Sequence, residues 1–289
     1  MASISELRKQ IKGIKSTSKI TRAMKMVAGA RFNKAQVAMH NSRTFYNEVF
    51  STFSQLVVSA QQSQKVARHI TFDTKPFPLP KVGLVIITGD KGLCGDFNSS
   101  VIREAERTLK NPDNHISCVF TIGRKGCDYF KNKPDIQIIE YPNVFNNLEF
   151  AFADKLGLEI LKKFDEERLT SVVVISAQFR SMIKKEVTKT TLLPLYVDKS
   201  TKSTGCMYEP QDEDELMVSA MPFVVKSLIY KLMRESYVAE IAQRMRAMDN
   251  ATTNAGTLIE KITLEMNKVR QANITRELAE IIGTNEVIK

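Results

Sequence analysis

Residues 19–36 read KITRAMKMVAGARFNKAQ, and this stretch decides how the rest of the chain is interpreted. Its residues favour a helix, and it carries five positive charges with no acidic residue. Among the charges lies a block of small and medium apolar residues, comprising Met24 and the run from Met26 to Ala30. Because this segment suits neither an ordinary surface nor an ordinary core, we expect another part of the protein, or a partner, to pack against it.

The residues before this stretch predict that the helix begins near the N-terminus. Ser3 and Glu6 form a capping-box signature, in which each residue satisfies a free backbone N–H of the first turn. Apolar residues then recur with alternating three- and four-residue spacing at the positions Ile4, Leu7, Ile11 and Ile14. The first proline is Pro76, so the helix can run to about residue 60 and be about 85 Å long.

A second long helix is predicted at the other end of the chain. Acidic residues at positions 212–215 suit the N-terminal end of a helix dipole, and Pro222 is close enough to that end to be tolerated or to kink the helix. The same alternating spacing returns in a second apolar stripe, formed by Ile259, Ile262, Met266 and Val269. Each helix needs cover along its stripe, so we expect the two to form an antiparallel or staggered coiled coil.

The segment between the helices predicts an inserted α/β domain. Three prolines in residues 71–80 end the first helix. Buried strands are expected at 82–88, 116–122, 136–141 and 171–177, with amphipathic helices between them. This alternation is typical of a parallel, Rossmann-like sheet with helices on its faces. The predicted domains are therefore 1–70, 71–208 and 209–289.

Composition restricts the class of protein. The chain has 289 residues, of which 43% are hydrophobic and 26% charged, as in a folded soluble protein. No apolar run approaches a membrane span and the N-terminus lacks the apolar block of a secretory signal, so we expect no membrane-spanning segment. The spacing of the four cysteines fits no zinc site, and we interpret them as reduced thiols. None of the three histidines has an obvious carboxylate partner, which weakens any enzyme interpretation.

The positive charge is concentrated at one end. Residues 1–60 carry ten Lys or Arg against two acidic residues, whereas residues 205–289 carry ten against thirteen. The basic helix could lie on nucleic acid, but it lacks the interleaved aromatic residues that stack on bases. It could also be a solvated coiled-coil face, or meet a protein surface rich in Asp and Glu. The methionines at helical spacing are interpreted as packing residues.

A glycine-rich turn, TGDKGLCGDFNSS, is the most enzyme-like feature. Gly89, Gly92 and Gly95 follow a predicted strand and precede a helix, where backbone N–H groups could hold a phosphate. Their spacing matches neither the dinucleotide-binding nor the P-loop pattern. A structural strand-to-helix turn remains the other interpretation.

Three stretches together resemble the γ subunit family of the F-type ATP synthase: 19–31, 243–256 and 268–282. The glycine turn at 89–100 is also similar to that family. Within its C-terminal signature, Ile274, Thr275, Glu277 and Glu280 match, but Thr284 and Asn285 stand where Gly-Ala is usual, so the tip is expected to pack differently.

The resemblance implies a central stalk. The two helices would form a shaft inside the ring of catalytic α and β subunits, and the α/β domain would be a foot beside the ε subunit on the membrane rotor ring of c subunits. Ion flow would turn the shaft and drive the β subunits through their conformations. The chain itself would be non-catalytic, with no cofactor, metal, nucleotide or nucleic acid bound. Its expected location is the cytoplasmic face of a bacterial inner membrane, in preference to the mitochondrial matrix.

The resemblance also assigns roles to residues. Contacts between the rotor and the surrounding subunits are expected from Lys19, Arg22, Lys25, Arg270 and Gln271, the last two as a catch on a loop of one β subunit. Close packing of the shaft is expected from Met24, Val27 and Ala28, together with the C-terminal stripe, and the three glycines would be structural. An α/β enzyme with helical oligomerisation arms and a coiled-coil nucleic-acid binder remain alternatives, and the coupling ion stays open.

Overall fold

The computed structural model describes residues 3–59, 69–71, 81–112, 114–132, 136–182, 184–198 and 213–287. Side chains within the last helix are described for residues 215–279. By its internal contacts the chain forms two compact units, one of residues 1–29 and 244–289 and the other of residues 30–243. This division cuts through both long helices, whereas the domains proposed above end at helix ends; those boundaries stay a prediction. We call the two units the shaft unit and the sheet unit and describe each by itself.

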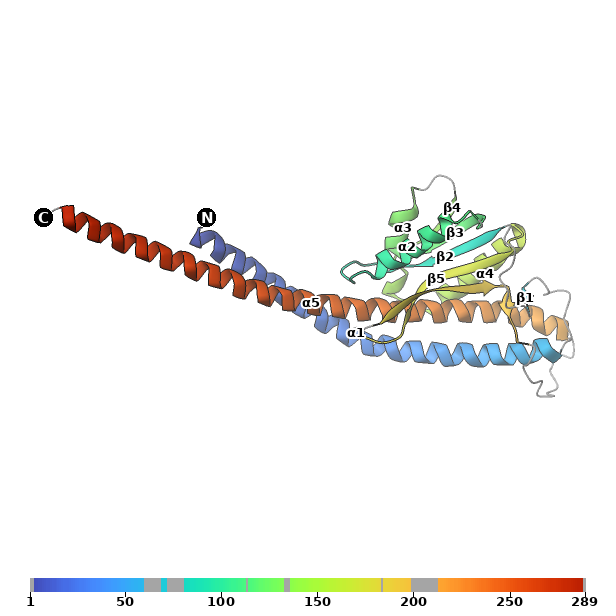
Figure 1. Ribbon diagram of the computed structural model, residues 1–289. Helices are drawn as coiled ribbons and strands as arrows, with labels where there is room; N and C mark the ends of the chain where they lie inside the picture. The colour runs from blue at the N-terminus through green and yellow to red at the C-terminus, as the bar shows by residue number, and fades with distance from the viewer. Residues whose placement is uncertain are drawn as a thin grey trace. The chain divides into compact units, whose positions relative to one another are not determined.

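Both predicted long helices are present (Figure 1). α1 spans Ile4–Ser59 and α5 spans Glu213–Val287. The capping box is confirmed, because the Ser3 N–H donates to Glu6 Oε2 at 2.9 Å and the Glu6 N–H donates to Ser3 Oγ at 3.2 Å. Pro222 lies inside α5, past its first turn, and does not end the helix.

In the shaft unit, α1 and α5 run antiparallel. Thr21 Oγ1 lies 2.7 Å from Thr252 Oγ1, and Lys25 Nζ lies 2.6 Å from Asp249 Oδ1. As the residue number rises along α1, it falls along α5, as the predicted antiparallel coiled coil requires. Extended along both helices, this register places Ile4 opposite about residue 270. The end of α5 therefore continues past the start of α1, as Figure 1 shows.

The sheet unit contains the predicted α/β domain. Its five strands lie in the order β4-β3-β2-β5-β6, with bounds Gln137–Tyr141, Ile116–Ile122, Val82–Ile87, Ser171–Phe179 and Lys185–Leu193. The first four are mutually parallel, and β6 is antiparallel to β5. Helices α2 Phe97–Lys110, α3 Arg124–Phe130 and α4 Phe150–Glu166 connect the strands. The parallel-rich Rossmann-like sheet is thus confirmed.

Three strands were not predicted. β6 has the sequence KEVTKTTLL, in which the polar residues of a half-exposed edge strand hide the apolar pattern. The other two, β1 Ile70–Thr71 and β7 Leu195–Tyr196, are two residues long and pair with each other in a separate parallel ribbon. Strands this short carry no periodicity that a sequence pattern could show.

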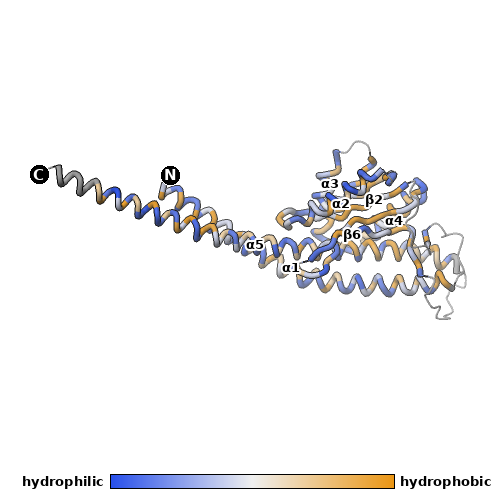
Figure 2. Tube along the Cα trace, viewed as in Figure 1, coloured by the Kyte–Doolittle hydropathy of each residue, from blue (hydrophilic) through white to orange (hydrophobic). Residues whose placement is uncertain are grey.

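Two apolar cores lie on the two faces of the sheet, and hydrophobic residues concentrate in its strands (Figure 2). On one face Leu84 and Ile86 of β2 pack with Phe97 and Val101 of α2. The other face, which includes Val85, packs with α4, α1 and α5 in the larger core. Residues 221–243 of α5 are buried or half-buried on almost every side, because α5 packs against both the sheet domain and α1.

One 18-residue window within Glu215–Ala279 is long and apolar enough, by composition, to cross a membrane. The expectation that no segment reaches this level is therefore wrong. Half of that window is buried inside the protein, as is typical of the core helix of a soluble protein. Of the predicted reduced thiols, Cys94, Cys118 and Cys127 are buried and form no disulfide, and Cys206 lies outside the described residues.

Candidate functional site

The glycine turn after β2 is fixed by bonds to both following helices. The Gly89 N–H donates to Asn98 Oδ1 at 2.8 Å, and the Lys125 N–H donates to the Gly89 carbonyl at 3.1 Å. Gly95 has φ +60°, a conformation that favours glycine, whereas a Cβ on Gly92 would come no nearer than 4.0 Å to Lys125 Cε. The turn thus needs glycine at Gly95 for its backbone, and not at Gly92.

Asp90 occupies the position where a phosphate would be expected. Its side chain is buried, and its carboxylate accepts backbone N–H bonds from Arg124 and Asn143 on Oδ1, both at 2.9 Å, and from Phe145 on Oδ2 at 2.8 Å. These donors lie beyond the carboxyl ends of β3 and β4, the edge at which open α/β sheets bind ligands. An anion belonging to the chain itself therefore satisfies the backbone donors of this edge.

The seam of the shaft unit is narrow and follows a 3.5-residue repeat. On α1 the less exposed positions include Leu7, Ile11, Ile14, Ser18, Thr21, Lys25 and Ala28. Ala28 is 4% exposed, as expected of a packing residue, and Met24 is half-buried. The expectation for Val27 is wrong, because its side chain is 55% exposed. The repeat places residues 25 and 28 on the seam, and residue 27 falls beside it.

The predicted C-terminal stripe also lies on the seam of α5. Ile259, Ile262, Met266 and Val269 are half-buried and continue the spacing of Met245, Met248, Thr252 and Ala255. In a coiled coil of only two helices, the sides of each seam residue stay open to solvent. The residues of this stripe are therefore half-buried and not fully buried.

The predicted contact residues of the rotor lie on the surface of the shaft unit. Lys19, Arg22, Arg270 and Gln271 are all exposed. Lys25 differs, because its ammonium is paired with Asp249 and its side chain is 40% exposed. Its charge is therefore partly compensated within the chain, which sequence reasoning did not foresee.

Sequence reasoning also missed the polar contacts within the sheet unit. Arg43 Nε of α1 lies 2.6 Å from Glu235 Oε1 of α5, and the Glu235 side chain is 3% exposed. Lys231 lies over the Tyr46 ring at 4.4 Å from its centroid, and burial lowers the pKa of this lysine. A buried acid and a half-buried base in otherwise apolar helix stretches, at matching antiparallel positions, were the signal that could have indicated these pairs.

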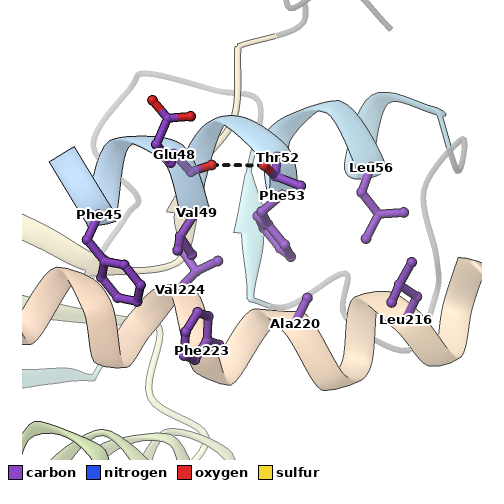
Figure 3. Close-up of a pocket in the computed structure, with 10 residues that line it drawn as sticks. All are labelled: Phe45, Glu48, Val49, Thr52, Phe53, Leu56, Leu216, Ala220, Phe223 and Val224. Carbon is purple, nitrogen blue, oxygen red and sulfur yellow. Dashed lines mark hydrogen bonds between the residues drawn. The ribbon is translucent and has the colours of Figure 1, made fainter. Parts of the chain in front are cut away.

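A groove of about 510 Å³ lies between α1 and α5 in the sheet unit (Figure 3). Phe45, Val49 and Phe53 of α1 point toward Ala220 and Phe223 of α5. Glu48 and Thr52 are the polar residues among its ten lining side chains. The groove is otherwise apolar and contains no arrangement of groups suited to acid-base or nucleophilic chemistry.

These features define a class of protein: an antiparallel two-helix shaft whose C-terminal helix is also the central helix of an α/β domain. The family model described as ATP synthase matches residues 3–288. The ATP synthase gamma chain of Halothermothrix orenii is 36% identical over 295 residues, and the alignment covers both chains completely. That of Desulfitobacterium hafniense is 31% identical over 98% of each chain. The chain belongs to the ATP synthase gamma chain family.

Solved structures agree with this assignment. The central stalk and c-ring structure of the Tetrahymena thermophila mitochondrial ATP synthase contains a chain with 25% identity and a TM-score of 0.62, and the match covers 80% of this chain and 99% of that one. A chain in the Euglena gracilis enzyme shares the fold, with a TM-score of 0.66 at 17% identity over 99% of this chain. As a gamma chain, the protein is a subunit of a membrane-associated ATP synthase complex.

Proposed function

We propose that this chain is the rotating central shaft of an ATP synthase and is itself non-catalytic. Ion flow through the membrane ring turns the sheet unit, and the shaft unit drives the catalytic β subunits through their conformations. Its partners are the α and β subunits around the shaft, and the ε subunit and the c-ring at the sheet unit. The complex lies on the cytoplasmic face of a bacterial inner membrane.

The charge of the shaft unit is the observation that carries this proposal. Residues 1–29 and 244–289 hold fourteen of the Lys and Arg residues against seven acidic ones, which is most of the net charge of +10. The named cations Lys19, Arg22 and Arg270 are exposed on it. Charge acts at longer range and with less directional preference than apolar pockets, so it suits a rotor that must contact acidic loops of its housing without being held by them.

The arrangement around Asp90 supports a non-catalytic sheet domain. A phosphate at this edge would have to displace a buried carboxylate that already holds three N–H donors. Two anions at one set of donors repel each other, so the site favours the carboxylate alone. Stoichiometric binding of ATP, ADP or a dinucleotide to the isolated chain in equilibrium dialysis would contradict this part of the proposal.

Rotation can be observed directly. Lys110 is exposed at the end of α2, and a Lys110→Cys variant with Cys206→Ser offers an attachment point for a gold particle, because the other three thiols are buried. In immobilised complexes of this chain with its α and β subunits, the particle should rotate in three steps per turn when ATP is added. Active hydrolysis with a stationary particle would overturn the proposal.

A further inference from the structure

Within the sheet unit, one face of α5 contacts the α/β domain, which we call the sheet domain: the five-stranded sheet with helices α2, α3 and α4. Lys226 Nζ lies 2.6 Å from Asp154 Oδ1 of α4. Further along the helix, Arg234 donates to the Leu148 carbonyl, and the Tyr237 ring stacks on Phe145 with centroids 5.8 Å apart. Glu240 comes next in this stripe, and its side chain is 3% exposed. These four residues spread over about 21 Å of helix, so their contacts, including the one of Glu240 described next, together resist movement of α5 against the sheet domain.

Glu240 meets the glycine turn at Gly89, where an added methyl group would require the Glu240 carboxylate to move. A Cβ on Gly89 would lie 2.6 Å from Glu240 Oε1 and 2.8 Å from its Cδ. The turn is held in place by the bonds from Gly89 to Asn98 and from Lys125 to Gly89. Glu240 is 3% exposed, so its side chain has little open space into which to move. This close approach explains the glycine at position 89.

We propose that the contact between Glu240 and Gly89 sets the angular position of α5 against the sheet domain, and that Glu240 is a positioning residue for rotary coupling. This rests on the proposed function, because torque applied to the sheet unit enters the shaft unit through the two long helices that run into both, and α5 is the one that Glu240 belongs to. Of the four contacts, this one lies nearest to the point at which α5 passes into the shaft unit, at Arg244. If Glu240 is displaced, α5 rotates about its own axis close to Arg244. Such a rotation passes directly into the part of α5 that belongs to the shaft unit.

The test is a double-mutant cycle in the complete complex in membranes. Gly89→Ala adds one methyl group that pushes against the carboxylate, whereas Glu240→Ala removes the carboxylate and leaves room for that methyl. The readout is the number of ions pumped per ATP hydrolysed, measured beside the hydrolysis rate and the yield of assembled complex. Gly92→Ala is the matched control, because it lies in the same turn and its added methyl would come no nearer than 4.0 Å to Lys125 Cε.

Gly89→Ala should lower the number of ions pumped per ATP hydrolysed below the wild-type number, while hydrolysis continues. In the Glu240→Ala background the same methyl should cause no further loss, because residues in direct contact are not additive. Gly92→Ala should leave the ratio unchanged. An equal loss from Gly89→Ala in both backgrounds, or no loss in either, would overturn the inference.

If Gly89→Ala lowers assembly too far for this measurement, the yield of assembled complex is compared instead for the two single variants and the double variant. Losses of yield that add up in the double variant would equally overturn the inference. The proposed function fails separately. It fails if the gold particle on the wild-type complex does not rotate, whereas the present inference fails if all complexes rotate and the variants keep the wild-type coupling ratio.

Discussion

Single side chains hold the carboxyl edge of the sheet together, and Asp90 is the plainest case. It accepts one N–H at the start of α3 and two from the segment that follows β4. No pattern in the sequence marks this residue, since its donors are backbone groups 34 to 55 residues further along the chain. Only the folded chain brings them to one carboxylate.

Asp90→Ala should therefore destabilise the isolated chain. Each buried donor left without an acceptor costs about 1 to 3 kcal/mol, and water can reach some of the space that the carboxylate leaves. We expect a fall in the free energy of unfolding of at least about 2 kcal/mol, or roughly 4 to 8 °C in Tm. Asp128→Ala is the control, because Asp128 is exposed on the neighbouring helix α3. Equal Tm values for the two variants would show that the three bonds contribute little.

Tyr46 makes stability depend on pH in the alkaline range. Burial raises the pKa of its phenol from 10.0 to about 12, so the folded chain keeps the proton over a range in which the unfolded chain loses it. Its contribution is fully present below pH 10 and is lost as the pH rises toward 12, by about 1.4 kcal/mol for each pH unit. Tyr46→Phe should lose less stability than wild type between pH 10 and 12, measured by urea unfolding. An exposed ring, Tyr196→Phe, serves as control, and parallel curves for wild type and Tyr46→Phe would contradict this.

Arg270 tests the predicted catch between rotor and β subunit. Arginine offers a planar fork for a carboxylate, and Gln271 adds a donor and an acceptor beside it. On a solvated face, by contrast, an ion pair contributes only about 0 to 1 kcal/mol. Arg270→Ala should slow multi-site ATP hydrolysis and synthesis in the assembled complex while single-site nucleotide binding stays near normal. Lys268→Ala is the control, because it removes a positive charge from an exposed residue two positions before Arg270. Wild-type multi-site rates in both directions for Arg270→Ala would make the solvated face the better interpretation.

At the scale of elements, periodicity predicted the long helices and the four parallel strands well. The helices are long and β2, β3 and β5 are mostly buried, so their residues repeat the same environment several times, whereas β4 is a short, partly exposed strand. The seam was located less accurately. Val27 and Ala28 are both small and apolar, and composition cannot distinguish them, whereas the register with α5 buries one and exposes the other. The Lys25–Asp249 pair shows the same limit, because a charge on the seam becomes visible only with its partner opposite.

The C-terminal end of α5 extends beyond the start of α1, so α1 does not cover it. Ile274 and Leu278 are 48% and 54% exposed, and the side chains of the atypical Thr284 and Asn285 lie outside the described residues. Deleting residues 283–289 should lower assembly yield or torque without abolishing turnover, since we propose that the bulk of the shaft, rather than any single side chain, drives the β subunits. A deletion from residue 259 onward removes the half-buried stripe and should prevent assembly. Complete loss of ATPase activity in fully assembled complexes that lack only 283–289 would refute this.

At the scale of the whole molecule, one chain combines two kinds of helix environment. In the sheet unit α5 is covered on nearly all sides, and in the shaft unit it shares only a narrow seam with α1. A covered helix is fixed in rotation about its own axis, and a helix with a narrow seam presents most of its surface to partners. The proposed function accounts for both environments, because a rotating shaft would be driven at one part and would touch the surrounding subunits at another.

The 3.5-residue repeat of the seam also gives the shaft a handedness. Helices that keep this repeat supercoil to the left, like the strands of a left-handed rope. Twisting such a rope in one sense tightens it, and twisting it in the other sense loosens it. An ATP synthase turns its shaft in opposite senses during synthesis and hydrolysis. We therefore expect this shaft to be torsionally stiffer in one working direction than in the other, and to store more elastic energy at a given torque in the softer one.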